Sequence, residues 1–418
     1  MINRIINDSF FLYILVGHAY TLNGDNMKFW IYLVTSMFVV SIFFACTNNE
    51  EGIIVFPKEE RALYFSYIEL DNYLEGKCSS EQKDNIIEVL DNIKSIDFNK
   101  IILHVRPFAD SIYKSNYYPL SKSVLDNNGD YPDYDVLDYF IKEAHKRKIL
   151  VDAWINPYRI SNSKDINTLS KDSLYYKYDS KVTDKGIYLN PANKEVQDLI
   201  VNGIIEIVKN YDVDGIHFDD YFYPDKKIDL DSYKEYINNS GKLSLNDYRL
   251  ENVKSLISKV YSEIKKENPK VLFGISPEGN INNCYDNSYL DVKYILSHEG
   301  YVDYIMPQIY YGFFNQTRPF KETLDEWNNM IKTDSISLLP ALALYKSGKS
   351  DKYALSGSNE WIDNNDIISR EILLSRNASN YKGFSLFSYN YLFNKDYQNN
   401  NNIIELENIK KILNKGTN

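Results

Sequence analysis

The stretch Val213-Asp-Gly-Ile-His-Phe-Asp-Asp220 joins a short apolar run to a pair of carboxylates. Residues 213–218 have the composition of a strand. Nearly continuous apolar runs of this kind are typical of strands that are buried on both faces in a parallel sheet. The stretch therefore predicts a buried strand with two acidic side chains directly after it.

Seven further runs of the same kind flank this strand. We expect them as strands at residues 61–68, 100–106, 149–154, 270–275, 302–306, 335–339 and 382–387. Segments with helical spacing of apolar residues lie between them, at residues 134–148, 194–211, 245–268, 320–331 and 363–376. The alternation predicts an α/β fold, a (β/α)8 TIM barrel over residues 60–395. An open doubly wound sheet is the competing fold, but no Gly-rich phosphate loop follows the first strand.

Composition narrows the class of protein. The chain has 418 residues, of which 44% are apolar and 25% charged, which is typical of a globular protein. Its formal net charge of −11 argues against nucleic acid as a partner, because such partners need a positive surface. Neither the three cysteines nor the five histidines show the spacing of a metal site, and we predict no cofactor.

The N-terminal segment has the pattern of an export signal. Met27-Lys28 is a second plausible start, so residues 1–26 are interpreted as lying upstream of the true start. An uncharged apolar run ends at Ile42-Phe-Phe-Ala-Cys46, which resembles a bacterial lipobox. We predict a signal peptide at 27–45, lipidation of Cys46 and a tether over 46–59. An uncleaved membrane anchor is the alternative, and Cys46 is then incidental. Both interpretations place the barrel outside the cytoplasm, attached to the membrane.

Polar and aromatic residues follow most of the expected strands, and in this fold active sites form at the carboxyl ends of the strands. The mixture of amides, charges and rings is typical of a carbohydrate site. The residues expected to bind substrate are Arg106, Asp110, Trp154, Asn156, Tyr158, Arg159, His217, Tyr221, Gln308 and Tyr310. Arg106 either holds a substrate carboxylate or pairs with Asp110, and Trp154 is either a stacking platform or a core residue. Residues 396–418 are expected to form a helix that packs on the barrel.

Cleavage of a glycosidic bond needs two carboxyl groups that flank it. Asp219 is the first candidate for nucleophile or stabiliser, with Asp220 beside it and Glu278 as the second carboxyl after the next strand. Because side chains alternate along a strand, Asp219 and Asp220 cannot both point inward if the strand continues. Asp219 could instead cap a helix, and Glu278 could be a solvated loop residue. Asp110 and Glu69 are further candidates for the second carboxyl group.

Several motifs together resemble the glycosyl-hydrolase-like 10 family of bacterial envelope proteins, and the resemblance covers about residues 60–395. The motifs are Arg61-Ala-Leu-Tyr-Phe-Ser-Tyr67, His104-Val-Arg-Pro-Phe-Ala-Asp-Ser-Ile-Tyr113, Glu143-Ala-His-Lys-Arg147, Ala153-Trp-Ile-Asn-Pro-Tyr-Arg159, Leu189-Asn-Pro191, Tyr211 to Pro224, Phe273-Gly-Ile-Ser-Pro277 and Met306-Pro-Gln-Ile-Tyr310. The resemblance implies a TIM-barrel glycosidase that acts on cell-wall glycan. The segment from Gly215 to Asp220 also resembles the strand-4 motif of the α-amylase and α-galactosidase barrels, in which the aspartate is the nucleophile, and this second resemblance implies that role for Asp219. The run after Pro277 departs from the family pattern, so the resemblance does not support Glu278 as the acid.

Three functions are compatible with these observations. The first is hydrolysis of an envelope polysaccharide, with the glycan strand of peptidoglycan as substrate. The second is a non-catalytic glycan-binding lipoprotein that keeps the cleft but lacks a second competent carboxyl. The third is a metal-dependent deacetylase or phosphodiesterase, which His217 and its two neighbouring aspartates suggest and which the lack of a second histidine at a strand end disfavours.

Overall fold

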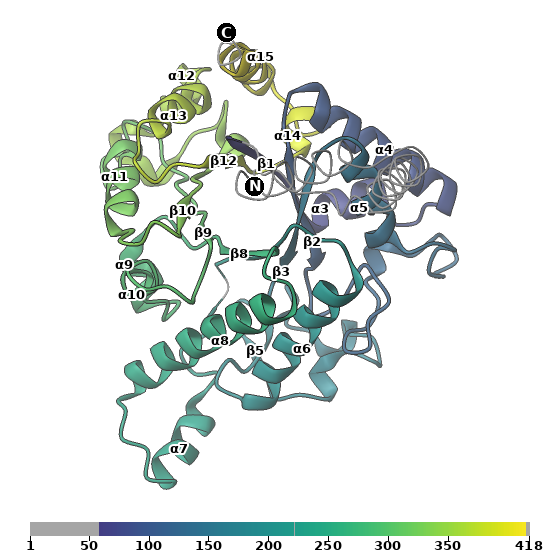
Figure 1. Ribbon diagram of the computed structural model, residues 1–418, viewed down its shortest axis with the longest axis vertical. Coiled ribbons are helices and arrows are strands. Elements are labelled where there is room, and N and C mark those ends of the chain that lie inside the picture. Colours follow the sequence, from purple (N-terminus) through teal and green to yellow (C-terminus); the bar gives the residue numbers. More distant parts are fainter. Residues whose placement is uncertain (1–57, 221, 415–418) are drawn as a thin grey trace, which may run out of the picture. The chain divides into compact units, whose positions relative to one another are not determined.

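The computed structural model describes residues 58–220 and 222–414. The predicted signal peptide, Cys46, nearly all of the tether and Tyr221 lie outside the described residues. Within them, the main sheet has nine strands that pair in parallel, in the order β10-β9-β8-β7-β3-β2-β1-β12-β11 (Figure 1). The strands are β1 (Glu60–Phe65), β2 (Lys100–Arg106), β3 (Leu150–Ile155), β7 (Gly215–Phe218), β8 (Leu272–Ile275), β9 (Tyr304–Ile305), β10 (Ser337–Leu338), β11 (Ala341–Leu342) and β12 (Gly383–Leu386).

The sheet closes on itself at Pro340. Strands β10 and β11 are separated only by Leu339 and Pro340, and they pair with opposite ends of the sheet, β9 and β12. On one side Leu339 N donates to Ile305 O (2.9 Å), and on the other Ser385 N donates to Pro340 O (3.0 Å). The prediction of a (β/α)8 barrel is therefore confirmed, with β10 and β11 as one interrupted strand. The predicted seventh strand ended too early, because proline interrupts a ladder without ending the pairing of the chain.

Helices follow the strands and cover the outside of the barrel (Figure 1). They are α3 (Tyr67–Tyr73), α4 (Ser79–Ser95), α5 (Val136–Lys146), α6 (Lys194–Asn210), α7 (Leu230–Asn238), α8 (Leu245–Glu267), α9 (Ile281–Asp286), α10 (Val292–Ile295), α11 (Phe320–Met330), α12 (Glu360–Asp363), α13 (Ile367–Ser375), α14 (Asn390–Phe393) and α15 (Asn400–Asn414). The C-terminal helix α15 packs against α13 and α14. In the described part of the chain, every helix is too short or too polar to cross a membrane.

Two local features differ from the sequence-based expectation. The first strand was expected to reach residue 68, but Ser66 ends it and caps α3. Glu69 completes this capping box by accepting from Ser66 N (2.8 Å), so its carboxylate is buried in a structural role. The long connection after β3 folds into a small antiparallel sheet of β4 (Arg159–Ser161), β6 (Gly186–Leu189) and β5 (Ser180–Thr183).

Strand alternation sorts the apolar side chains into an inner and an outer core. Leu63 and Phe65 of β1 face the helices, where most of the buried apolar residues gather. Their neighbours Ala62 and Tyr64 point into the barrel. The inner cluster consists of Ala62, Tyr64, Ile102, Trp154, Tyr304, Met306, Leu339 and Ala341.

A chain of buried polar groups also runs through the barrel. It starts at Lys100, whose Nζ contacts Glu60 Oε2 (2.6 Å) and Asp152 Oδ2 (3.0 Å). Tyr304 Oη donates to Asp152 Oδ2 (2.8 Å) and contacts His217 Nδ1 (2.9 Å). Burial opposes the ammonium charge, but the two carboxylates outweigh it and raise the pKa of Lys100. The lower end of the barrel is therefore ionic, and its ammonium group is paired with two carboxylates, whereas Asp152 Oδ1 has no hydrogen-bond partner among the described residues.

Tyr64 carries the polar chain to the upper end of the barrel. Its hydroxyl contacts His217 Nε2 (3.0 Å) and Ser276 Oγ (2.9 Å). Burial lowers the pKa of His217 to about 3, so the imidazole is neutral. Since Tyr304 donates its proton to Asp152, the consistent tautomer of His217 donates from Nδ1 and accepts from Tyr64 at Nε2.

Two glycines make room for this chain. A Cβ at Gly215 would lie 2.5 Å from Asp152 Oδ1, and one at Gly274 would lie 2.1 Å from the Tyr304 ring. Both distances are far below van der Waals contact. The glycine within the stretch 213–220 is therefore required by the carboxylate of the neighbouring strand.

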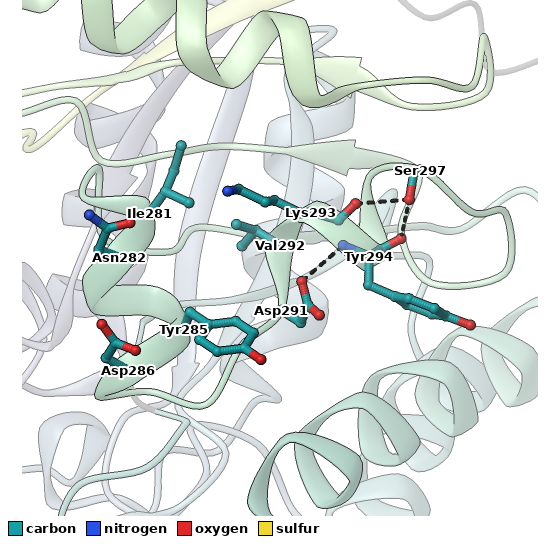
Figure 2. Close-up of a pocket in the computed structure, with 9 residues that line it drawn as sticks. All are labelled: Ile281, Asn282, Tyr285, Asp286, Asp291, Val292, Lys293, Tyr294 and Ser297. Atoms are coloured by element: carbon teal, nitrogen blue, oxygen red, sulfur yellow. Dashed lines mark hydrogen bonds between the residues drawn. The ribbon is translucent and has the colours of Figure 1, made fainter. Parts of the chain in front are cut away.

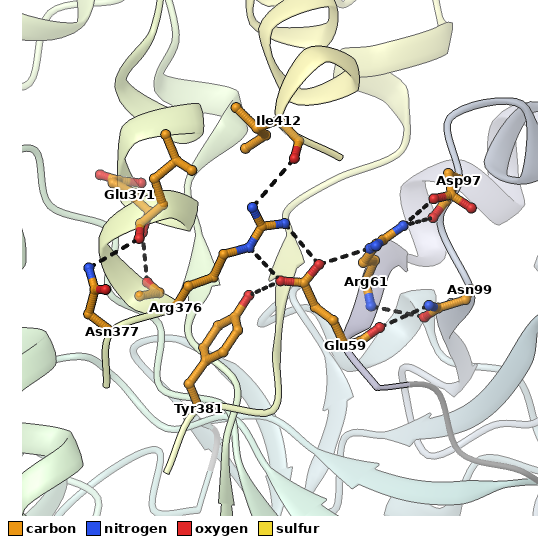
Figure 3. Close-up of polar contacts among 11 residues, drawn as sticks. Glu59, Arg61, Asp97, Asn99, Glu371, Arg376, Asn377, Tyr381 and Ile412 are labelled. Carbon is orange, nitrogen blue, oxygen red and sulfur yellow. Dashed lines mark hydrogen bonds and ion pairs between the residues drawn. The ribbon is translucent and has the colours of Figure 1, made fainter. Parts of the chain in front are cut away.

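Glu59 ties the start of the barrel to its C-terminal helices (Figure 3). It accepts from Arg376 Nε (2.7 Å), Tyr381 Oη (2.9 Å) and Arg61 Nε (3.0 Å). Burial alone would raise the pKa of Glu59, but these hydrogen bonds lower it overall. Arg376, at the end of α13, also donates to Ile412 O in α15 (3.4 Å). Arg376 therefore links the last helix to Glu59, the residue that precedes β1.

Candidate active site

A cavity of about 280 Å³ opens where the barrel strands end. Each residue of its wall lies near the carboxyl end of a strand or in the segment that follows it. The lining residues are Tyr64, Ser66, Tyr67, Ile68, His104, Trp154, Arg159, Asp219, Asp220, Gln308, Tyr310, Tyr345 and Phe387. Loops at this end of a TIM barrel form active sites, and the wall of this cavity carries two carboxylates, Asp219 and Asp220.

Asp219 is held by two side chains from the end of β3. Its Oδ2 accepts from Trp154 Nε1 (3.2 Å) and from Asn156 Nδ2 (3.0 Å). The carboxylate is only 4% exposed, so these donors replace most of its water. Trp154 is fixed in turn by stacking on His104, with ring centroids 3.6 Å apart and planes 8° apart. The arrangement presents a firmly oriented carboxylate to the cavity.

Asp220 also lies on the cavity wall, because β7 ends at Phe218 and the alternation of side chains stops there. Gln308 Nε2 donates to its Oδ1 (3.2 Å) and to Ser276 O (3.0 Å). Burial, together with the negative charge of Glu278, raises the pKa of Asp220 to about 6. With a pKa of about 6, roughly a tenth of this carboxyl group is protonated at pH 7, a far larger fraction than for an exposed aspartate.

Glu278 lies beside the cavity and is absent from its lining. Its backbone bridges to Gln308, and its Oε2 accepts from Asn283 Nδ2 in α9 (2.9 Å). Its charge still reaches Asp220, whose pKa it raises. The structure thus places the three predicted carboxylates close together, with two on the cavity wall and Glu278 behind them.

Arg159 supplies positive charge to the cavity wall. Its guanidinium lies over the rings of Phe108 (4.7 Å) and Tyr67 (5.6 Å), and its Nε donates to Pro107 O (3.2 Å). Asp110 lies nearby but does not line the cavity. Its Oδ1 accepts from Phe108 N (3.0 Å), and burial raises its pKa.

The placement of Arg106 corrects the expectation that it binds substrate or pairs with Asp110. The register between β2 and β3 shifts between His104 and Arg106, so a bulge follows His104. His104 therefore points into the barrel while Arg106 points out of it. The Arg106 guanidinium lies over the Tyr118 ring (4.2 Å) under α6, and the side chain is 1% exposed.

His217 and Tyr158 also lie away from the cavity, contrary to the expectation that they contact substrate. His217 is fully buried below the cavity, where both ring nitrogens contact tyrosine hydroxyls. Tyr158 is fully buried in the outer core. Trp154, Arg159, Gln308 and Tyr310 do line the cavity, and Asn156 reaches it through Asp219.

The cavity contains residues that sequence reasoning did not select. Tyr345 follows the second half of the interrupted strand, β11, which the apolar pattern of the sequence did not predict. His104 sits opposite Trp154 in the strand register, a partner that only the pairing of β2 with β3 reveals. Tyr67 and Phe387 complete the aromatic wall. Tyr67 follows Ser66, at the point where the first strand was expected to continue.

A larger hollow of about 480 Å³ lies against α9 and α10 (Figure 2). Its polar groups serve the local backbone: Asp291 Oδ1 accepts from Tyr294 N (3.0 Å), and Ser297 Oγ donates to Lys293 O (2.9 Å). No pair of strand-end carboxylates faces it. We therefore place the active site in the smaller cavity. Within the described ranges, no three His, Cys, Asp or Glu side chains are grouped to hold a metal ion.

The loop that carries Asp219 and Asp220 is anchored from α8. Asp229, at the far end of this loop, receives Arg249 Nε (2.8 Å) and Nη2 (2.7 Å) and Tyr223 Oη (2.9 Å). Arg249 and Asp229 are both almost completely buried. A bidentate ion pair of this kind fixes orientation as well as position.

Comparison with known proteins places this geometry in a family. Residues 59–359 match the sequence profile of the family Glycosyl hydrolase-like 10. The glycosyl hydrolase YngK of Bacillus subtilis (strain 168) is 33% identical over 387 residues, and the match covers 87% of this chain and 73% of that protein. The glycosyl hydrolase DigH of Escherichia coli (strain K12) is 32% identical over 342 residues, covering 74% of this chain and 76% of that protein.

Solved structures show the same fold at low sequence identity. The glycoside hydrolase domain of PgaB (BpsB) from Bordetella bronchiseptica has a TM-score of 0.50 and 11% identity, covering 81% of this chain and 97% of that one. Alpha-L-fucosidase isoenzyme 2 from Paenibacillus thiaminolyticus has a TM-score of 0.50 and 11% identity, covering 85% and 49% of the two chains. The barrel is therefore of the kind that glycoside hydrolases use.

The anchor of the Asp219 loop gives a test of stability. We expect Arg249→Met to lower the free energy of unfolding by about 3–5 kcal/mol, because it leaves the Asp229 charge buried without its partner. Chemical denaturation at pH 7 measures this value. Lys142→Met, which removes an exposed pair with Asp138, should cost less than about 1 kcal/mol. Equal losses in the two variants would show that the Asp229 pair does not anchor the loop.

Proposed function

The chain belongs to the glycosyl hydrolase-like 10 family, and from this premise we propose that it hydrolyses glycosidic bonds in bacterial envelope polysaccharide, with the glycan strand of peptidoglycan as substrate. The observation that carries the proposal is the pair of carboxyl groups on one cavity wall, Asp219 and Asp220, in different environments. One accepts two side-chain hydrogen bonds, and the other has its pKa raised to about 6.

These environments suit the two roles that glycoside hydrolysis requires. We assign the general acid to Asp220, which donates its proton to the glycosidic oxygen as the bond to the anomeric carbon breaks. Asp219 stays ionised and faces the positive charge that develops on the sugar, either attacking the anomeric carbon or activating water. Water supplies the hydroxyl group of the new reducing end and restores the proton to the carboxyl pair.

In this proposal Glu278 and Gln308 do not contact the scissile bond. They set the pKa and the orientation of Asp220. The charge of Glu278 raises the pKa of Asp220, which keeps a larger protonated fraction at neutral pH. Gln308 orients Asp220 through its amide, which is itself fixed on Ser276 O. In this proposal Glu278 is a positioning residue that acts through Asp220.

The choice of peptidoglycan rests on the family resemblance and on the charge of the wall. Arg159 places a guanidinium on a cavity that otherwise holds carboxylates and aromatic rings. Arginine suits bidentate recognition of a carboxylate. A muramic acid residue without its peptide carries such a group on its lactyl side chain, next to the sugar ring.

A non-catalytic glycan-binding role is the second candidate. It is favoured by the position of Glu278, which was the expected second carboxyl and lies off the cavity wall. The two functions differ in a single result: a binding protein retains glycan strands without shortening them.

Digestion of purified peptide-free glycan strands tests the hydrolase. We expect residues 47–418 of the chain to release new reducing-end fragments, detected by mass spectrometry. Asp219→Asn and Asp220→Asn should each lower the rate by about 100-fold or more, because each removes one of the two carboxyl groups. Asp184→Asn, at a fully exposed surface position, should leave the rate unchanged. Intact strands that cosediment with the protein would favour the binding role.

The pH dependence follows from the acid role of Asp220. Its pKa is raised to about 6, and the acid must be protonated, so kcat/KM should fall about tenfold per pH unit above that value. Glu278→Gln removes a negative charge that raises this pKa, so the descending limb should move to lower pH. Asp231→Asn, an exposed control, should leave the limb in place. A profile without a descending limb near pH 6 would remove Asp220 from the acid role.

We further propose that residues 27–45 act as an export signal and that Cys46 carries a lipid, which places the barrel on the outer side of the membrane. Wild-type protein expressed in a bacterium should then sediment with membranes and take up a labelled fatty acid. Cys46→Ser should lose the label. A wild-type chain without label would leave the apolar run as an uncleaved anchor, or Cys46 as incidental.

A further inference from the structure

Three large apolar side chains are strongly exposed on two loops that also contribute residues to the wall of the cavity. Phe314 is 63% exposed, Tyr353 72% and Leu355 58%. We refer to these three residues as the crest. Single exposed apolar residues are common, but a group of them at a functional rim marks an interaction site.

The crest stands on two loops that also build the cavity. The segment after β9 contributes Gln308 and Tyr310 to the wall before it reaches Phe314. The segment after β11 contributes Tyr345 before it reaches Tyr353. The Tyr310 and Tyr345 rings meet edge to face with centroids 5.7 Å apart, so the two loops are in contact at the cavity wall.

Hydrogen bonds hold the two loops together. Gln316 N donates to Ala354 O (3.4 Å), and the Gln316 amide contacts Ser356 Oγ. Gly357 packs directly on the backbone of Phe314, where a Cβ would lie 2.1 Å from Phe314 O. The crest residues are therefore parts of one surface.

Their exposure is built into the fold. The buried carboxylate of Glu360 accepts from Phe313 N (2.9 Å) and Phe314 N (2.8 Å), which fixes the backbone that turns Phe314 outward. Leu355 has φ 55° and ψ −118°, a conformation that side chains with a Cβ rarely adopt. Ala354 beside it is buried. Strained positions of this kind persist where the surroundings impose them, and they cluster at ligand sites.

We propose that the crest binds the part of the polysaccharide strand that lies outside the cavity, with the Phe314 and Tyr353 rings against sugar faces. This inference rests on the proposed polysaccharide substrate. The cavity, at about 280 Å³, is smaller than the roughly 300–1,000 Å³ of pockets that enclose drug-sized ligands. A polymer must extend beyond the cavity, and the crest lies farther along two of the loops that form the cavity wall.

The chemistry around the crest suits a hydrated ligand. Sugars present apolar ring faces and hydroxyl edges, and they need rings and hydrogen-bonding groups side by side. Gln316 and Ser356 lie on the same two loops and supply an amide and a hydroxyl that contact each other. The Lys352 ammonium lies 4.9 Å from the Tyr353 ring centroid, which keeps charge and water at the same surface.

The test compares long and short substrates with a Phe314→Ser/Tyr353→Ser variant of the full chain. We expect kcat/KM on long peptide-free strands to fall about tenfold, while hydrolysis of fragments too short to leave the cavity changes less than about twofold. Cosedimentation with long strands, measured in an Asp219→Asn background, should weaken by a similar factor. Ile403→Ser, which removes a half-exposed apolar side chain from α15, is the matched control and should change neither value.

The outcomes separate this inference from the proposed function. If the wild type binds long strands through the crest and does not cleave them, the proposed hydrolase activity is contradicted and the crest proposal is supported. Unchanged cleavage and binding of long strands by the variant would contradict the crest proposal. Equal losses of kcat/KM on long and short substrates, with an unchanged melting temperature, would also contradict it. Crest-dependent binding to anionic phospholipid vesicles, with strand binding unaffected, would overturn it in favour of a membrane contact.

Discussion

The buried polar chain inside the barrel is the constraint on which the rest of the structure depends. It runs from Lys100 through Asp152, Tyr304, His217 and Tyr64 to Ser276, and it joins β1, β2, β3, β7, β9 and the end of β8. Each member needs its neighbour, because an unpaired polar group at this depth costs far more than the net gain of a typical hydrogen bond. A strand that slipped in register would leave one of these groups unpaired, so the chain sets the heights of the strand ends.

The positions of these strand ends determine the geometry of the candidate active site. Trp154 and Asn156 end β3 beside β7 and therefore reach Asp219. Because β7 stops at Phe218, Asp220 escapes the alternation that would have turned it away from the cavity. Two adjacent residues thus meet different surroundings: Asp219 accepts from Trp154 and Asn156, whereas Asp220 accepts from Gln308 and has its pKa raised by burial and the charge of Glu278. In the proposed mechanism, this difference makes Asp219 the carboxylate and Asp220 the carboxylic acid.

Buried polar interactions also hold the loops that follow the strands. Buried carboxylates hold the loops from beneath, Asp229 through Arg249 and Glu360 through the backbone of Phe313 and Phe314. Rigid loops keep the cavity wall in place and leave apolar rings exposed at the crest. The barrel supplies the position of each loop, while the loops supply the exposed side chains of the crest.

The sequence by itself determined the barrel, its strand–helix alternation and the strand end at which Asp219 lies, because burial of a parallel strand leaves a continuous apolar run that can be seen in one dimension. It did not determine which side of β2 carries Arg106, since a bulge shifts the register without any local signal. Nor did it show that both ring nitrogens of His217 contact tyrosine hydroxyls, or that Tyr345, which follows Pro340, lines the cavity. Those outcomes depend on which strands become neighbours, and only the tertiary structure decides that, because it is the closed sheet that brings distant residues within hydrogen-bonding distance.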